Sequence, residues 1–308
     1  MGKTKTSYVC ELTPSQTAQF KDLLIPKGWQ FDDAPHALWR AKGQGATVIA
    51  YESGKVVIQG KGTPDVVQFV LEPEVLGEAR FGYERELAEV ENPEMFTAHA
   101  GIDESGKGDY FGPLVIASAY VDERTAAALL DAGVMDSKRI GSDKRVNDLC
   151  EVTKKTVRGQ FSIVPIGPEA YNRLHGKLKN VNRILGWGHA RALENLLEKV
   201  DDCPRAVSDQ FASKQTVKRA LMARGKSIEL QQMPRAEADI AVAAASILAR
   251  AEFVRRLQTL SEEMNVKLPK GASQAVINAA REVVAKHGRD ALQRVAKVHF
   301  KTTARVLA

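Results

Sequence analysis

The chain has 308 residues, of which 44% are apolar and 27% are charged, so it can build packed cores and lacks the composition of a disordered protein. A single domain usually has about 100 to 200 residues, so this length predicts two domains. The net charge of +6 is unevenly divided, with +2 over residues 1–71, −6 over 72–99 and +10 over 100–308. A basic C-terminal part suits a polyanionic substrate, although ordinary surface charge would also explain it.

The cysteines and the lengths of the apolar segments indicate the cellular compartment of the protein. Cys10, Cys150 and Cys203 are odd in number, widely separated and without the spacing of a zinc site. The N-terminus lacks the apolar core of a signal peptide, and no stretch approaches the roughly 20 apolar residues of a membrane span. These features predict a cytoplasmic protein with reduced thiols and no membrane association.

Residues 1–71 have the pattern of a small α+β domain. Strands are predicted over residues 8–12, 37–41, 46–51 and 55–60, and the last two are joined by a hairpin at Glu52-Ser53-Gly54. Thr13-Pro14-Ser15 is typical of a helix start, and Thr63-Pro64-Asp65 starts a second helix. The order predicts a sheet covered by helices on one face.

Residues 72–97 are acidic, contain Pro73 and Pro93, and show no strand pattern. They predict a linker with one helical turn. Its like charges would keep the segment solvated, or would pair it with the basic domain.

Residues 98–308 alternate between strands and helices, which predicts an α/β domain with a mixed sheet and flanking helices. Strands are predicted over 98–104, 114–121, 160–166, 206–209 and 228–232. Helices are predicted over 142–155, 182–200, 236–260, 272–287 and 290–298, the first of them capped by Ser142.

The run from Gly101 to Pro113 carries the strongest chemical signal. Asp103 and Glu104 stand where a strand ends in the turn Gly106-Lys107-Gly108. Both glycines allow positive φ and a close approach of the backbone to a ligand. Exposed amides and Lys107 would favour a phosphate or a sugar hydroxyl.

Two further acids stand at informative positions. Asp209 ends another predicted strand, and Asp239 begins a long helix whose dipole would help to keep it ionised. Two Mg²⁺ ions need a dense set of oxygen ligands, which four carboxylates could supply. Acids that only cap helices or end strands are common as well, so for Asp239 a structural role stays open.

Several motifs together resemble those of a known family. They are Asp103-Glu104-Ser105-Gly106-Lys107-Gly108, Asp136-Ser137-Lys138, Lys179-Asn180-Val181-Asn182 with Trp187-Gly188-His189-Ala190, Ser208-Asp209-Gln210-Phe211, Ala236-Glu237-Ala238-Asp239 and His299-Phe300-Lys301. In this order they resemble the type 2 ribonucleases H, and most closely the bacterial ribonuclease HIII branch. The likeness spans residues 98–301.

The resemblance implies a ribonuclease H-like fold and endonucleolytic cleavage of RNA paired with DNA, with 5′-phosphate and 3′-hydroxyl products. It implies that Asp103, Glu104, Asp209 and Asp239 are catalytic and hold two Mg²⁺ ions, with Mn²⁺ as an alternative. Asp239 would complete the metal site or order the attacking water. A monomer is expected.

The resemblance also implies the substrate contacts. Ser105, Gly106, Lys107 and Gly108 would read ribose 2′-hydroxyls, which distinguish RNA from DNA, and Lys138 and Asn182 would contact the substrate nearby. Residues 1–71 are similar to a small domain of the TATA-binding-protein fold that grips the hybrid. Lys55 and Lys61 would bind there, together with Lys42, Trp39 and Tyr51, although some of these aromatic residues could belong to the core.

Three alternatives remain open from sequence. A ribonuclease HII-like enzyme would nick duplexes beside one embedded ribonucleotide, a catalytically silent protein would only bind hybrids, and another metal nuclease would act on DNA junctions. The role of His189 is also open, because it could pack on a helix face or approach the nucleic acid.

Overall fold

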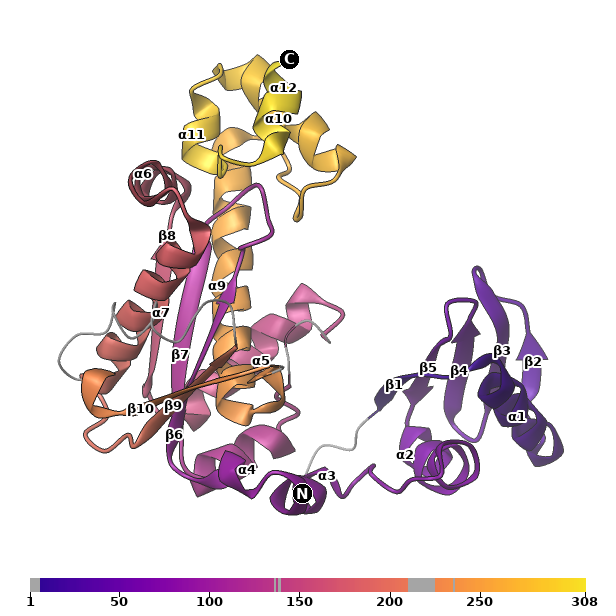
Figure 1. Ribbon diagram of the computed structural model, residues 1–308. Coiled ribbons are helices and arrows are strands. Elements are labelled where there is room, and N and C mark those ends of the chain that lie inside the picture. Colours follow the sequence, from indigo (N-terminus) through magenta and orange to yellow (C-terminus); the bar gives the residue numbers. More distant parts are fainter. Residues whose placement is uncertain (1–5, 136, 138–139, 210–224, 235) are drawn as a thin grey trace. The chain divides into compact units, whose positions relative to one another are not determined.

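The computed structural model describes residues 6–135, 137, 140–209, 225–234 and 236–308. The chain forms two compact units, residues 1–91 and 92–308 (Figure 1). Each unit has its own five-stranded sheet.

The N-terminal unit is built on a five-stranded antiparallel sheet with the order β1-β5-β4-β3-β2. The strands are β1 (Ser7–Glu11), β2 (Gln30–Asp32), β3 (Ala37–Gly43), β4 (Ala46–Tyr51) and β5 (Lys55–Gly60). Four of them were predicted, and the three-residue β2 was not.

Helices cover one face of this sheet (Figure 1). Helix α1 (Pro14–Leu24) begins at a capping box formed by Thr13 and Gln16, and the short turn η1 (Ile25–Lys27) follows it. Helix α2 (Thr63–Val66) continues as the π-helix η2 (Val67–Leu76). Alternate strand residues are buried against these helices, among them Val48, Ala50, Val56 and Ile58 with Phe20, Leu24, Val70 and Leu71. The opposite face of the sheet is therefore the open one.

Residues 72–97 contain more structure than the single helical turn that the sequence predicted. They include the end of η2, helix α3 (Glu84–Glu91) and the turn η3 (Pro93–Phe96). The carboxylate of Glu72 is buried and accepts the backbone N–H groups of Arg80 and Phe81 at 2.8 to 3.0 Å. The start of the acidic segment thus belongs to the N-terminal core, because the Glu72 carboxylate is hydrogen-bonded to the backbone and not to solvent, as it would be in a linker.

The C-terminal unit contains a mixed five-stranded sheet with the order β10-β9-β6-β7-β8. Its strands are β6 (His99–Ser105), β7 (Leu114–Val121), β8 (Phe161–Ile166), β9 (Arg205–Asp209) and β10 (Glu229–Met233). β6 is antiparallel to β7 and parallel to β9. The strand order reverses at β6, and in open α/β sheets ligands bind beyond the carboxyl ends of the strands at such a point.

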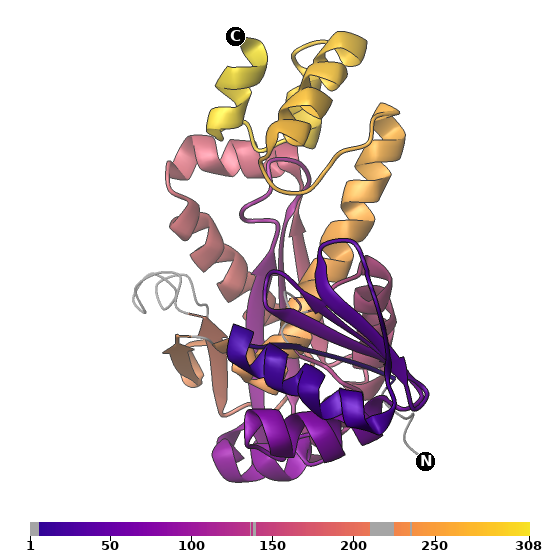
Figure 2. The same ribbon diagram turned by 90° about the vertical axis from the view of Figure 1, so that its right-hand side faces the viewer.

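Two long helices lie on opposite faces of this sheet (Figures 1 and 2). Helix α7 (Val181–Leu197) packs on the face that carries Ala100 and Ile102. Helix α9 (Ile240–Met264) packs on the other face, where a Cβ at Gly101 would lie 2.1 Å from the backbone nitrogen of Val242. The backbones of β6 and α9 therefore run in direct contact.

The remaining helices complete the C-terminal unit. They are α4 (Glu123–Asp131), α5 (Asp143–Thr156), α6 (Pro168–Leu178), α10 (Gln274–His287), α11 (Ala291–Val295) and α12 (Lys301–Leu307), with the short turns η5 (Gly225–Ser227) and η6 (Ala236–Ala238). Ser142 caps α5 as predicted. Across the described part of the chain, we find no helix that is both long enough and apolar enough to traverse a lipid bilayer.

Candidate active site

The glycine turn after β6 depends on Gly106. Its φ is +87°, and a Cβ there would lie 2.2 Å from the carbonyl oxygen of Pro113 and 2.8 Å from the ring of Phe253. Gly108 differs, because its φ lies outside the left-handed region and nothing comes within 4 Å of a Cβ built on it. The expectation of positive φ at Gly108 was wrong, whereas the open space beside it suits the approach of a ligand.

A buried lysine anchors this turn to the C-terminal helices. The ammonium of Lys297 donates to the carbonyl oxygens of Asp109 and Gly112, each at 2.8 Å. Burial lowers the pKa of Lys297 to about 7. Sequence reasoning missed this residue, because a buried lysine has no local signature.

The register of the sheet brings Asp103 and Asp209 together. β6 and β9 are parallel, and Ile102 lies opposite Ser208, so the next residues are Asp103 and Asp209. Neighbouring strands are about 4.8 Å apart, which places the two backbones within reach of one shared cation. Both side chains lie on the α9 face, because Gly101 and Val207 contact α9 two residues earlier.

Glu104 lies on the opposite face of β6 and contacts α7. Its Oε2 lies 3.0 Å from Nε2 of His189, a wholly buried residue, and its Oε1 lies 3.6 Å from Nζ of Lys107. Of the two roles considered for His189, packing on a helix face and approaching the nucleic acid, the structure shows the first. The residue that it contacts is a candidate catalytic carboxylate. The signal in the sequence was its place on the apolar stripe of α7, four residues after Leu185.

The two adjacent acids titrate differently. Burial, together with the neighbouring charge of Glu104, raises the pKa of Asp103 to about 6, against a smaller lowering by the Ser246 hydroxyl. Burial would also raise the pKa of Glu104, but the hydrogen bond from His189 and the charges of His189 and Lys107 outweigh it, so this pKa lies below its usual value. The negative charge of Glu104 thus disfavours the ionised form of Asp103, and a cation bound between the two carboxylates would relieve this repulsion.

The structure does not bring Asp239 to this group. Asp239 caps α9, where its Oδ1 accepts the backbone N–H groups of Ala241 at 2.9 Å and Val242 at 3.1 Å. Both of its carboxylate oxygens lie 3.0 Å from Nε2 of buried His99, at the start of β6. The two elements run in the same direction, and Asp103 meets Ser246, seven residues further along α9. Seven helical residues span about 10 Å, so Asp239 lies too far away to share a cation with Asp103.

The donor set fits a hard divalent cation only in part. Asp103, Glu104 and Asp209 supply carboxylate oxygens, which Mg²⁺ and Mn²⁺ prefer. Among the residues that the structure describes, no three His, Cys, Asp or Glu side chains are arranged to hold a metal ion. The fit therefore rests on the oxygen chemistry and on the strand register, with Glu104 reaching the site from the other face.

The other predicted substrate contacts of this unit lie around the same strand end. Ser105 is half-buried in β6, and Lys107 is exposed in the turn. Asn182 is exposed in the first turn of α7, whose cap is Asn180. Lys138 lies outside the described residues, as does Asp136 of the same motif.

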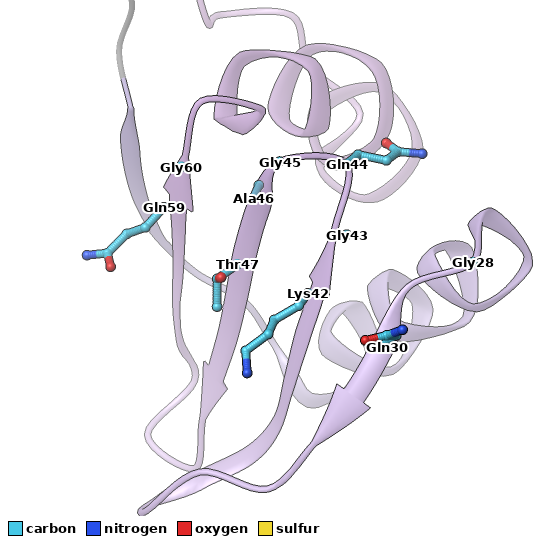
Figure 3. A pocket seen from close by; sticks show the side chains of 10 residues that line it. All are labelled: Gly28, Gln30, Lys42, Gly43, Gln44, Gly45, Ala46, Thr47, Gln59 and Gly60. Atoms are coloured by element: carbon cyan, nitrogen blue, oxygen red, sulfur yellow. The ribbon is translucent and has the colours of Figure 1, made fainter.

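The N-terminal unit offers a separate polar surface. A shallow pocket of about 490 Å³ lies on its open sheet face, where Figure 3 shows Lys42 beside Thr47. It is lined by Gly28, Gln30, Lys42, Gly43, Gln44, Gly45, Ala46, Thr47, Gln59 and Gly60. Lys55 and Lys61 are exposed at the two ends of β5, Tyr51 is half-buried, and Trp39 is buried in the core. Of the two aromatic residues predicted to contact the hybrid, Trp39 is therefore not accessible to a ligand.

Family models match both units. The model described as Ribonuclease HII matches residues 100–303, which include the glycine turn and all the candidate acids. A domain of unknown function (DUF3378) matches residues 7–76. These ranges agree with the two sheets of the structure.

Relatives and solved structures match nearly the whole chain. The protein is 40% identical over 284 residues to a Ribonuclease HIII of Protochlamydia amoebophila, covering 92% of this chain and 91% of the relative. It is 39% identical to a Ribonuclease HIII of Chlamydia pneumoniae, covering 96% of each. The structure resembles that of Bst-RNase HIII in complex with Mn²⁺, with a TM-score of 0.66, 27% identity and 98% coverage of both chains. On this evidence the chain belongs to the ribonuclease HIII family.

Proposed function

We propose that this protein is an endoribonuclease that hydrolyses the RNA strand of RNA/DNA hybrids with two divalent cations and leaves 5′-phosphate and 3′-hydroxyl ends. Membership of the family makes it a ribonuclease H-type hydrolase. The observation that carries the finer proposal is the register that sets Asp103 beside Asp209, next to the glycine turn. Solved Bst-RNase HIII contains Mn²⁺, which supports a divalent cation here, and we propose Mg²⁺ as the usual one.

In this proposal Asp103, Glu104 and Asp209 hold the cations at the scissile phosphate. Two bound cations would activate a water molecule and stabilise the leaving oxygen. Lys107, exposed and 3.6 Å from Glu104, would pair with a phosphate when substrate arrives. Asp239 instead keeps α9 in place through its cap and its bond to His99, so it would act on the site only through the position of the helix.

The glycine turn would provide the selectivity for RNA. The open space at Gly108 lets a sugar come close to the backbone, and Ser105 and Gly106 carry the adjacent amides. A ribose differs from a deoxyribose in its 2′-hydroxyl, which is both a donor and an acceptor. We infer that the backbone of this turn reads that hydroxyl, while Asn182 contacts the neighbouring strand.

The N-terminal unit would grip the hybrid by its backbone. Lys55 and Lys61 stand at opposite ends of β5, about 20 Å apart by strand geometry, and could therefore reach different phosphates. Lys42 contributes less, because Asp32 binds it at 3.1 Å and also pairs with Arg40. Such contacts raise affinity without reading sequence. The cytoplasmic location and the monomeric state stay predictions.

A cleavage assay in Mg²⁺ tests the proposed function. One substrate is an RNA strand fully paired with DNA, and the other is a DNA duplex with a single embedded ribonucleotide. Cuts at many positions in the hybrid, with 5′-phosphate and 3′-hydroxyl ends, are expected. Nicking confined to the lone ribonucleotide would replace the proposal with ribonuclease HII-like specificity, and binding without cleavage of either would make the protein a silent hybrid-binding module.

A further inference from the structure

His189 and Glu104 form a buried contact that links helix α7 to the candidate metal site. The side chain of His189 is wholly buried, and that of Glu104 is only 12% exposed. The ring nitrogen Nε2 lies 3.0 Å from Oε2 of Glu104. A carboxylate has no proton to donate, so its oxygen can only accept in this contact. Nε2 therefore carries the proton and donates it.

The neighbouring glycine allows this contact. A Cβ at Gly188 would lie 2.6 Å from Cδ1 of Ile116, a distance that real Cβ atoms do not adopt. Ile116 is the partner of Glu104 in the β6–β7 register. Gly188 thus lets α7 approach the sheet directly beside Glu104, and the next residue of the helix reaches its carboxylate.

Glu104 needs such support because of its position in the strand. Successive side chains of a strand point to opposite faces, so Asp103 faces α9 while Glu104 faces α7. Sharing a cation with Asp103 requires Glu104 to reach around the end of the sheet in one defined orientation. Its Oε2 contacts His189, and its Oε1, which lies 3.6 Å from the Lys107 ammonium, would then be the oxygen left for a cation.

We propose that His189 is a positioning residue that fixes the Glu104 carboxylate for cation binding, with Gly188 providing the helix approach that the contact requires. This inference rests on the proposed function, because it assumes that Glu104 is a metal ligand. Groups that hydrogen-bond to metal ligands typically contribute 10- to 100-fold to metal affinity or activity. Removing the donor should therefore weaken cation binding by roughly that factor.

The test compares two side chains of nearly the same length at position 189. His189→Gln keeps an amide donor close to the place of Nε2, and His189→Met fills the same space without a donor. The control is His287→Met, which removes a histidine whose Nε2 lies 2.7 Å from the carbonyl oxygen of Met264, at the far end of α9. The full-length proteins are titrated with Mn²⁺ alone by calorimetry, and kcat and KM are measured on the hybrid.

The proposal predicts a Mn²⁺ affinity about 10- to 100-fold lower in His189→Met, near-native affinity in His189→Gln, and no change in the control. In His189→Met kcat falls while KM for the hybrid stays the same. Equal Mn²⁺ affinities in the Gln and Met variants would overturn it.

If His189→Met does not fold, His189→Asn decides, since its amide is one methylene shorter than that of glutamine and falls short of the place of Nε2. A lower Mn²⁺ affinity in folded His189→Asn supports the proposal, and an unchanged affinity refutes it. Failure of the wild-type protein to cleave hybrids would instead reject the proposed function. Calorimetry without substrate keeps the two failures apart.

Discussion

Replacing Gly106 with alanine should unfold the C-terminal unit at a markedly lower temperature than replacing Gly108. At Gly106, φ is +87° and the new Cβ would meet the Pro113 carbonyl oxygen at 2.2 Å. An unfavourable backbone conformation costs about 1 to 3 kcal/mol. Overpacking against a fixed neighbour costs about another 1 to 3 kcal/mol. The sum is about 2 to 6 kcal/mol, a large share of a typical stability of roughly 5 to 15 kcal/mol.

Thermal unfolding of the full-length variants measures this difference. For a unit of this size each kcal/mol shifts Tm by about 2 to 4 °C, so Gly106→Ala should lose roughly 4 to 24 °C. Gly108→Ala adds a Cβ in open space and should change Tm by no more than about 4 °C, as a small increase. The same Gly108 variant should raise KM for the hybrid, because the added methyl group stands where a sugar would approach. Equal Tm values for the two variants would refute the reasoning.

Three further predictions follow from individual contacts. Asp239→Ala removes a helix cap, which costs about 1 kcal/mol, and leaves the buried ring nitrogen of His99 without its hydrogen-bond partner, which costs about 1 to 3 kcal/mol. Tm should therefore fall by at least roughly 4 °C at unchanged Mn²⁺ affinity, and lost Mn²⁺ binding at unchanged Tm would restore Asp239 as a ligand. Because burial lowers the pKa of Lys297 to about 7, the unfolded chain binds that proton more readily between pH 7 and about 10. The free energy of unfolding is measured with guanidinium for the wild type and for Lys297→Met. The wild-type value minus the variant value should rise by about 1 kcal/mol per pH unit over that range, and a difference that does not change with pH would contradict this. Lys55→Ala and Lys61→Ala should each reduce the salt slope of hybrid affinity by about 1, and an unchanged slope would remove these lysines from the interface.

Much of the fold follows from local patterns in the sequence. The apolar run of β7 is buried on both faces between β6 and β8, and its predicted bounds, 114–121, are those of the structure. Thr13 and Ser142 cap the helices that they were expected to cap. Helices α4, α6 and α12 were not predicted individually, because their amphipathic patterns are short.

The site was only partly predictable, because it depends on register and direction. The ends of β6 and β9 could be recognised from sequence, and their parallel register brings Asp103 to Asp209. The direction in which α9 runs along β6 has no local signal, and it places Asp239 about 10 Å along the helix from Ser246, the residue that Asp103 contacts. The contact between His189 and Glu104 likewise depends on how closely α7 approaches the sheet, which Gly188 decides. The position of Asp239 and the contact between His189 and Glu104 therefore depend on the packing of elements distant in sequence, which the spacing of the motifs does not reveal.

The most direct test of the account is the turnover and hybrid binding of Asp209→Asn in Mg²⁺. This substitution keeps the size of the side chain but removes one carboxylate of the proposed cation site. Loss of several kcal/mol of transition-state stabilisation corresponds to a decrease in kcat of at least about 100-fold. The hybrid Kd should stay within about threefold of wild type, because the lysines that bind the backbone are untouched. Wild-type turnover in this variant would contradict the assignment of the site.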